Sequence, residues 1–240
     1  MKYREKTYRD VVNAEDLLSY EVNVRETELQ IRSDIVLQDE AFASVYRFRN
    51  YIETYIKKNP NFLTSLTPLQ WDAFAPAIIQ QMMHAGTAAN VGPMASVAGA
   101  IAEFVGRDLL MKCKNVIIEN GGDIFLRSDR DRLVGIFTGN SSPWRKKIVL
   151  RIPGSAGSVG ICTSSGTVGH SISLGRADAV SIISGSATLS DAVATSIGNM
   201  IKSTQDIGKS IERARRIEGV QGVLIVVKDK IGLWGDMELT

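Results

Sequence analysis

Apolar and polar residues near the N-terminus alternate with a period of two and then change phase. The apolar positions are Val22 and Val24 before the change and Leu29 and Ile31 after it. The change of phase predicts a turn over residues 25–27, and therefore a β-hairpin. Apolar residues then recur at helical spacing over residues 39–58, and Pro60 follows as a stop signal. We predict a hairpin followed by one long amphipathic helix.

Small residues dominate the next part of the chain. A short helix is predicted over residues 76–86, followed by a run rich in Gly and Ala over residues 85–102. A second helix is predicted from Pro93 to about residue 111, because proline suits the first turn of a helix. Its small residues form a stripe at helical spacing: Ala95, Ala98, Gly99 and Ala102. Tight packing against another element and close approach to a ligand both explain such a stripe.

The second half of the chain reads as short strands with two helices between them. Short apolar runs bounded by turn residues predict strands over residues 116–118, 124–126, 133–137, 148–152, 158–162 and 180–183. Helices are predicted over residues 189–202 and 207–216, and a terminal hairpin over residues 223–227 and 231–234. Strands and helices in separate runs, without a repeat or a linker, indicate an α+β fold with a single domain over residues 1–240.

Composition and charge narrow the classes of partner. The chain has 240 residues, of which 44% are hydrophobic and 22% charged, as in ordinary globular proteins. A net charge of +2 gives no reason to expect nucleic acid or a membrane as partner. The N-terminus does not resemble a signal peptide, and two cysteines imply no disulfide framework. We therefore expect a cytoplasmic protein, and a homo-oligomer is compatible with these features.

The first segment that could support chemistry is a glycine turn between two predicted strands. It reads Asn120-Gly121-Gly122-Asp123. Glycines leave backbone amides bare, so that they can contact a phosphate, while Asp123 and Asn120 add a carboxylate and an amide. An ordinary hairpin turn is the alternative, and for this segment alone it is the favoured one.

The second segment is a loop rich in hydroxyl groups that follows a predicted strand. It holds Cys162, Thr163, Ser164, Ser165, Gly166 and His170. Hydroxyls and bare amides can together bind a pyrophosphate, and an imidazole can exchange a proton near neutral pH. Cys162 could be a nucleophile if its thiolate were stabilised, although a buried cysteine that only packs is commoner.

The third segment is the predicted helix that carries Asp191 and Thr195. These two residues are four positions apart and share one helix face, and Thr188 or Ser190 is expected to cap the helix. A carboxylate and a hydroxyl one turn apart offer two oxygens to a hard cation such as Mg²⁺. A structural carboxylate that interacts with the helix dipole explains the same spacing.

The order of these segments resembles the ApbE superfamily of FAD:protein FMN transferases. The matching strings are VAGAIAEF, NGGD, TSSG, a histidine and SDAVAT, within residues 92–199. The resemblance implies an ApbE-like, T-fold-like domain with mixed or antiparallel sheets packed against helices. It also implies that Asp191 and Thr195 bind Mg²⁺ and that the NGGD and TSSG segments line FAD. His170 and Asp191 are the catalytic candidates on this reading, and Cys162 is a catalytic candidate from the residues alone. An acceptor protein would be the second partner.

Two departures from the family pattern keep other functions open. The family histidine is normally followed by an Asp-Pro pair, which His170 lacks, and Ala98 stands where the family usually has a lysine. The resemblance implies a magnesium-dependent flavin transferase or FAD pyrophosphatase. A flavin-binding or nucleotide-binding module without catalysis is one alternative, and a thiol-dependent protein that handles sulfur or acyl groups at Cys162 is another.

Overall fold

The computed structural model describes residues 12–139, 142–144, 148–165, 175–235 and 238–239. They form an α+β fold, as the sequence predicts. Twelve strands are assigned, β1 (Val12–Asn13), β2 (Leu18–Val24), β3 (Thr27–Ser33), β4 (Val116–Asn120), β5 (Asp123–Arg127), β6 (Arg132–Gly135), β7 (Val149–Ile152), β8 (Ser158–Ser164), β9 (Ala179–Ser184), β10 (Val220–Val227), β11 (Lys230–Gly235) and β12 (Glu238–Leu239). The helices are α1 (Gln38–Lys58), α2 (Asn61–Thr64), α3 (Ala77–Ala89), α4 (Val97–Leu109), α5 (Ala187–Met200) and α6 (Ile207–Ala214), with 3₁₀ turns at Pro93–Ser96, Gly154–Ala156 and Thr204–Asp206.

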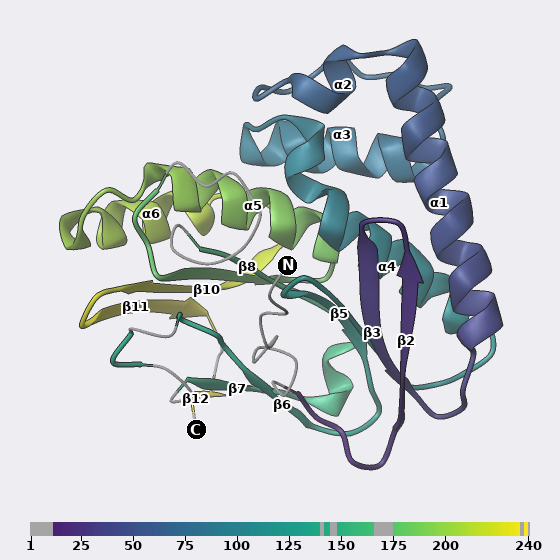
Figure 1. Ribbon diagram of the computed structural model, residues 1–240. Helices are drawn as coiled ribbons and strands as arrows, with labels where there is room; N and C mark the ends of the chain where they lie inside the picture. Colours follow the sequence, from purple (N-terminus) through teal and green to yellow (C-terminus); the bar gives the residue numbers. More distant parts are fainter. Residues whose placement is uncertain (1–11, 140–141, 145–147, 166–174, 236–237, 240) are drawn as a thin grey trace, which may run out of the picture.

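Two antiparallel sheets form the framework. The larger sheet has eight strands in the order β11-β10-β9-β8-β5-β4-β3-β2, and the smaller has four in the order β1-β6-β7-β12. Figure 1 shows the helices on one side of the larger sheet and the smaller sheet on the other. The sequence predicts mixed or antiparallel sheets, and every strand pairing in the described ranges is antiparallel.

Both faces of the larger sheet are buried at its central strands β4 and β5, and each of these strands contains three consecutive apolar residues. In β4, Ile117 packs towards the smaller sheet, whereas its neighbour Ile118 packs towards the helices. In β5, Phe125 faces the helices and Leu126 faces the smaller sheet. Successive side chains of a strand point to opposite faces, and here both faces exclude water. This explains why these strands read as continuous apolar runs.

Three glycines let α4 and α5 lie directly on the sheet and on each other. A Cβ on Gly106 of α4 would lie 2.2 Å from the ring of Phe125, and one on Gly160 of β8 would lie 2.3 Å from Ala187 of α5. A Cβ on Gly99 would lie 2.3 Å from the carbonyl oxygen of Ala187. Small residues at these positions therefore bring the two helices into contact, which supports packing as one role of the small-residue stripe.

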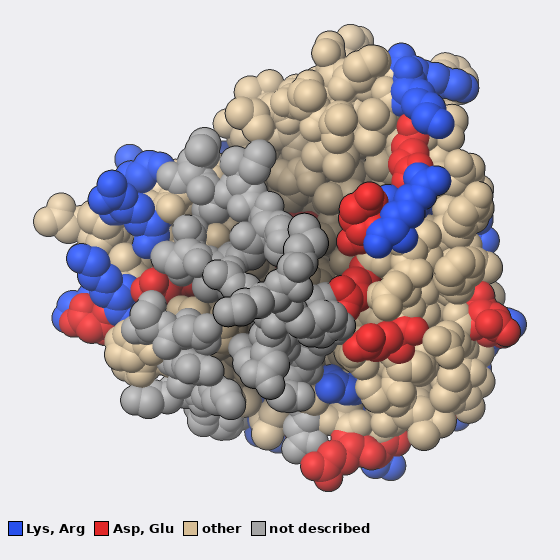
Figure 2. Space-filling model, viewed as in Figure 1, with Lys and Arg blue, Asp and Glu red and all other residues tan. Residues whose placement is uncertain are grey.

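Charged side chains stabilise the junction between α1 and the β2–β3 hairpin. Arg49 donates to Glu26 and to the hydroxyl of Thr27, and Arg25 pairs with Glu53. Figure 2 shows acidic and basic side chains interspersed over this part of the surface. The mixture of signs agrees with the small net charge of the chain and gives this region no broad field of one sign.

Within the described residues, no single helix is long and apolar enough to cross a membrane. Only α3 together with the segment Pro93–Leu109 reaches the necessary length and composition, and the two meet at an angle of 102°.

Candidate functional site

Helix α5 begins two residues before the predicted start, and its cap is a different residue. Ser186 occupies the N-cap position, and its hydroxyl accepts a hydrogen bond from the backbone N–H of Leu189 at 3.3 Å. Thr188 and Ser190, which were expected to cap the helix, lie inside it and are buried. The expectation was wrong because the helix extends back towards the strand β9 and the first serine available there is Ser186.

Asp191 and Thr195 both contact the segment at the start of α4. The Asp191 carboxylate accepts a hydrogen bond from the backbone N–H of Gly99 at 2.9 Å. The Thr195 hydroxyl donates to the carbonyl of Ala95, one residue before Ser96, at 3.4 Å. The shared helix face that the sequence predicts is therefore directed at residues 95–99.

The glycine turn reaches the same segment from the sheet. Gly121 and Gly122 have φ values of 66° and 108°, and Asn120 pairs with Asp123 across the turn. Positive φ at both central residues is the geometry in which glycine is favoured. The side-chain amide of Asn120 donates to the carbonyl of Ala98 at 3.0 Å. The turn is thus attached to the first turn of α4, beside Asp191.

Asp123 and Asp191 form a pair of interacting carboxylates. Although both side chains keep partial solvent exposure, burial raises the pKa of Asp123 to about 7, and the negative charge of Glu119 adds to the effect. Burial and the charge of Asp123 raise the pKa of Asp191 well above its usual value, against the opposing effect of the Gly99 and Ala98 amides. Two such carboxylates favour a proton or a cation between them.

The TSSG segment begins beside this pair. A hydrogen bond from the backbone of Thr163 and one from the thiol of Cys162 partly offset the rise in the pKa of Asp123. The Thr163 hydroxyl lies 2.8 Å from that of Ser181 on β9, and Ser164 and Ser165 are half-buried. Gly166 and His170 lie outside the described residues, so their proposed roles stay predictions.

Cys162 is a buried thiol. Its single S–H lies between two acceptors, the Asp123 carboxylate and the carbonyl of Ala187, whose oxygen is 3.3 Å from Sγ, and the side chain has no exposed area. Burial raises the pKa of the Cys162 thiol well above its usual value, and the charges of Asp123 and Asp191 raise it further. A reactive cysteine needs a stabilised thiolate. The surroundings of Cys162 are those of a packing residue, which does not favour a nucleophilic role.

The donor atoms fit a hard divalent cation. Asp123 and Asp191 supply carboxylate oxygens, Thr195 a hydroxyl, and Ala95 and Ala98 backbone carbonyls close to them. No three His, Cys, Asp or Glu side chains in the described ranges are grouped to hold a metal ion. A cation here would therefore need hydroxyl, carbonyl, water or substrate oxygens as well, which is the coordination that Mg²⁺ commonly has.

One residue of this region was not singled out from the sequence. Glu103 of α4 is fully buried and accepts hydrogen bonds from Ser186 and Thr188 at the start of α5. Its signal in the sequence is a charged residue within the apolar run of α4, four residues before the next charged residue, Arg107. A charge is rarely buried without partners, so this position could have been marked as one that contacts polar groups.

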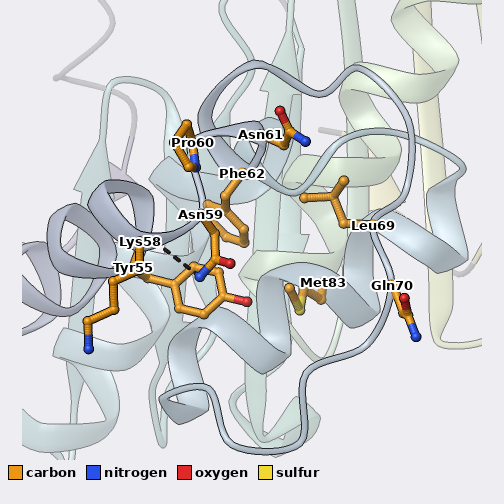
Figure 3. A pocket seen from close by; sticks show the side chains of 9 residues that line it. All are labelled: Tyr55, Lys58, Asn59, Pro60, Asn61, Phe62, Leu69, Gln70 and Met83. Carbon is orange, nitrogen blue, oxygen red and sulfur yellow. Dashed lines mark hydrogen bonds between the residues drawn. The ribbon is translucent and has the colours of Figure 1, made fainter.

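A surface depression of about 390 Å³ lies elsewhere, between the end of α1, α2 and α3 (Figure 3). Its wall includes Tyr55, Phe62 and Met83, and the amide of Asn59 donates to the Tyr55 carbonyl at 3.4 Å. None of the candidate residues described above lines it. It therefore adds nothing to the candidate site.

Comparisons with known proteins agree with the arrangement. The family model described as "AbpE bacteria" matches residues 9–232. A UPF0280 protein of Methanocaldococcus jannaschii is 43% identical over 201 residues, which cover 80% of this chain and 79% of the relative. A UPF0280 protein of Methanococcus aeolicus is 40% identical over 229 residues, covering 91% and 90%.

Two solved structures show the same fold. The apo form of the flavinyl transferase ApbE from Pseudomonas stutzeri has a TM-score of 0.59 at 12% identity, covering 93% of this chain and 94% of that one. The ApbE protein from Thermotoga maritima has a TM-score of 0.52 at 11% identity, covering 93% and 97%. At such low identity the likeness establishes the fold alone.

Proposed function

This chain belongs to the AbpE bacteria family, and from that premise we propose that it is a Mg²⁺-dependent enzyme that cleaves the pyrophosphate of FAD. With water as nucleophile, the products would be FMN and AMP. With a hydroxyl group of an acceptor protein as nucleophile, the FMN phosphoryl group would form a new ester bond to that oxygen, AMP would leave, and the hydroxyl proton would be released.

The observation that carries the proposal is the convergence of α5 and the β4–β5 hairpin on the start of α4. Asp191 and Thr195 of α5 contact Gly99 and Ala95 there, and Asn120 of the hairpin contacts Ala98. Asp123, at the other end of the same turn, is near enough for its charge to raise the pKa of Asp191. A bound Mg²⁺ would supply positive charge to the pyrophosphate and stabilise the charge that develops as the anhydride breaks. Asp191 and Thr195 would hold the ion, and Asp123 would add a second carboxylate beside it.

The remaining groups would bind the dinucleotide. A Cβ on Gly121 or Gly122 would meet nothing within 4 Å, so the backbone of the turn is open to an approaching molecule. The Gly122 N–H already donates to the Glu119 carboxylate at 2.8 Å, so a phosphate oxygen would bind the Gly121 N–H or take the place of Glu119 at Gly122. The hydroxyls of Ser164 and Ser165 at the end of β8 are further donors, and the start of α4 favours negative charge through the helix dipole. His170 would exchange the proton of the nucleophile or leaving group.

The test is product formation from FAD by the purified protein. Released AMP and FMN are separated by chromatography with Mg²⁺ and with EDTA, in the presence and absence of a candidate acceptor. We expect AMP release that requires Mg²⁺ and falls by at least about 100-fold in Asp191→Asn, because the ion loses its main carboxylate. The exposed Asp129→Asn serves as the matched control. Equal turnover in Asp191→Asn and the wild type would exclude the proposed site.

A binding module without catalysis is the second candidate, and Ala98 favours it. A methyl group stands beside Asp191 where the family usually has a lysine, so a cationic contact to phosphate is missing at this position. Isothermal titration with FAD and Mg²⁺ separates the two candidates. Tight binding without AMP release supports a carrier or sensor, whereas neither binding nor release would reject both.

A further inference from the structure

Glu103 lies in the middle of α4 and is fully buried. Its Oε2 atom accepts three hydrogen bonds from the start of α5: from the Thr188 backbone N–H at 2.9 Å, the Thr188 hydroxyl at 2.8 Å and the Ser186 hydroxyl at 2.7 Å. Its Oε1 atom pairs with Arg107 one turn further along α4. Hydrogen bonds to an ionised acceptor are about twice as strong as neutral ones, so this carboxylate holds the first turn of α5 firmly on α4.

The contact between the two helices is reciprocal. Glu103 extends from α4 to the first turn of α5, and Asp191 extends from α5 to the first turn of α4, where it accepts from Gly99. Gly99 precedes Glu103 by one turn of α4, and Thr188 precedes Asp191 by about one turn of α5. Each helix thus supplies a carboxylate to the other, and two contacts at successive turns fix both the distance between the helices and their register.

The same geometry couples Glu103 to the candidate site. Asp191 and Thr195 follow Thr188 on a single helix, so a shift of the first turn of α5 would move both side chains relative to residues 95–99. The close fit at Gly99, where a Cβ would lie 2.8 Å from the Asp191 Cβ, leaves little room for compensation. Glu103 itself contacts α5 and Arg107, and acts on the site only through α5.

We propose that Glu103 is a positioning residue that keeps Asp191 and Thr195 in place by fixing the first turn of α5 on α4. Its effect on the contact between Asp191 and Gly99 stands on the geometry alone, whereas its effect on Mg²⁺ rests on the proposed function.

The first test measures amide hydrogen exchange at Gly99 by NMR. The Gly99 N–H donates to the Asp191 carboxylate and makes no bond to the Glu103 side chain, so a change in its exchange reports movement of α5. We expect Glu103→Gln and Thr188→Val to speed exchange at Gly99 about tenfold, because each weakens the contact that fixes α5. Thr188→Ser, which keeps the hydroxyl, should behave as the wild type, and so should Glu40→Gln, which removes an ion pair on α1. Faster exchange at Thr188 with unchanged exchange at Gly99 would overturn the proposal.

The second test measures the Mg²⁺ concentration that gives half-maximal release of AMP. In Glu103→Gln we expect this concentration to rise about tenfold, with a turnover number near that of the wild type once Mg²⁺ is saturating. A variant that melts earlier but keeps wild-type Gly99 exchange and Mg²⁺ dependence would show that Glu103 is only structural. If the wild type neither binds FAD nor releases AMP, the proposed function fails, and the exchange at Gly99 still decides the positioning role.

Discussion

At the residue scale, the unusual feature is a carboxylate placed where its charge is unfavourable. Asp123 sits at the end of a hairpin turn, half-buried, beside Asp191 and close to Glu119. A neutral residue at this position would make the fold more stable, because the unfavourable negative charge would be removed. Residues with strongly shifted pKa values occur most often at functional sites. Asp123 therefore offers a direct way to separate stability from function.

The pKa of Asp123 determines how its charge affects stability. Its pKa is raised from 3.8 to about 7 in the folded protein, so the folded state holds the proton more tightly than the unfolded state. Stability therefore falls as the pH rises from about 4 to 7, and the full cost is present above pH 7. The upper bound of this cost is about 4 kcal/mol, and partial exposure reduces it.

We predict that Asp123→Asn raises the melting temperature by several degrees at pH 8 and leaves it nearly unchanged at pH 4.5, because only the ionised carboxylate is unfavourable. Thermal unfolding followed by circular dichroism at both pH values measures the difference, with the exposed Asp129→Asn as control. Added Mg²⁺ should stabilise the wild type at pH 8 more than it stabilises Asp123→Asn, which keeps Asp191 and Thr195. An equal melting temperature for Asp123→Asn and wild type at pH 8 would show that Asp123 is not destabilised in the fold.

At the element scale, the site depends on how closely α4 approaches α5. Gly99 is the residue at their contact, where a Cβ would lie 2.3 Å from the Ala187 carbonyl oxygen and 2.8 Å from the Asp191 Cβ. Neither atom belongs to the flexible end of a side chain. A larger residue must therefore separate the helices or distort one of them.

We predict that Gly99→Ala lowers the free energy of unfolding by about 2 kcal/mol and weakens Mg²⁺-dependent binding of FAD, because it displaces Asp191. Gly208→Ala in α6 is the matched control, since a Cβ there would meet nothing within 4 Å. That change should stabilise the protein by about 0.5 kcal/mol through the unfolded state. Chemical denaturation and isothermal titration measure the two effects. Equal stability of the two variants would contradict the close approach.

The elements themselves were largely predictable, whereas the contacts between them were not. Periodicity identifies α1 and α5 nearly to their ends and the β2–β3 hairpin by its turn, because each has a clear apolar pattern. The two-residue strands β1 and β12 are too short to have a pattern and depend on pairing with β6 and β7. The contacts of Glu103 with Thr188 and of Asn120 with Ala98 join residues far apart in the chain, which local spacing does not indicate.

At the scale of the whole molecule, the larger sheet connects three apolar clusters. Its β4 and β5 strands contribute Ile118 and Phe125 to the core beneath the helices and Ile117 and Leu126 to the core against the smaller sheet. Strand β9 likewise contributes to the core against the smaller sheet and to the core under α5. Each of these strands contributes side chains to two clusters. Loss of packing in one cluster would therefore expose one face of a strand whose other face is packed in the second cluster. The chain should therefore unfold as one unit, as the single predicted domain requires.

We predict a single thermal transition in which the calorimetric and van't Hoff enthalpies agree, and in which core substitutions on opposite faces of the larger sheet have the same kind of effect. Leu150→Ala removes a fully buried side chain of the smaller sheet, and Ile79→Ala removes one from α3. Each should lower the free energy of unfolding by about 2–5 kcal/mol and shift the whole transition downward by roughly 2–4 °C per kcal/mol.

The candidate site is assembled from α4, α5 and the β4–β5 hairpin. Binding of FAD should therefore be lost in the same thermal transition that unfolds the two cores. Two separate transitions, with Leu150→Ala moving one and Ile79→Ala the other, would show that the smaller sheet and the helical layer are independent units. The site would then depend on the helical layer alone.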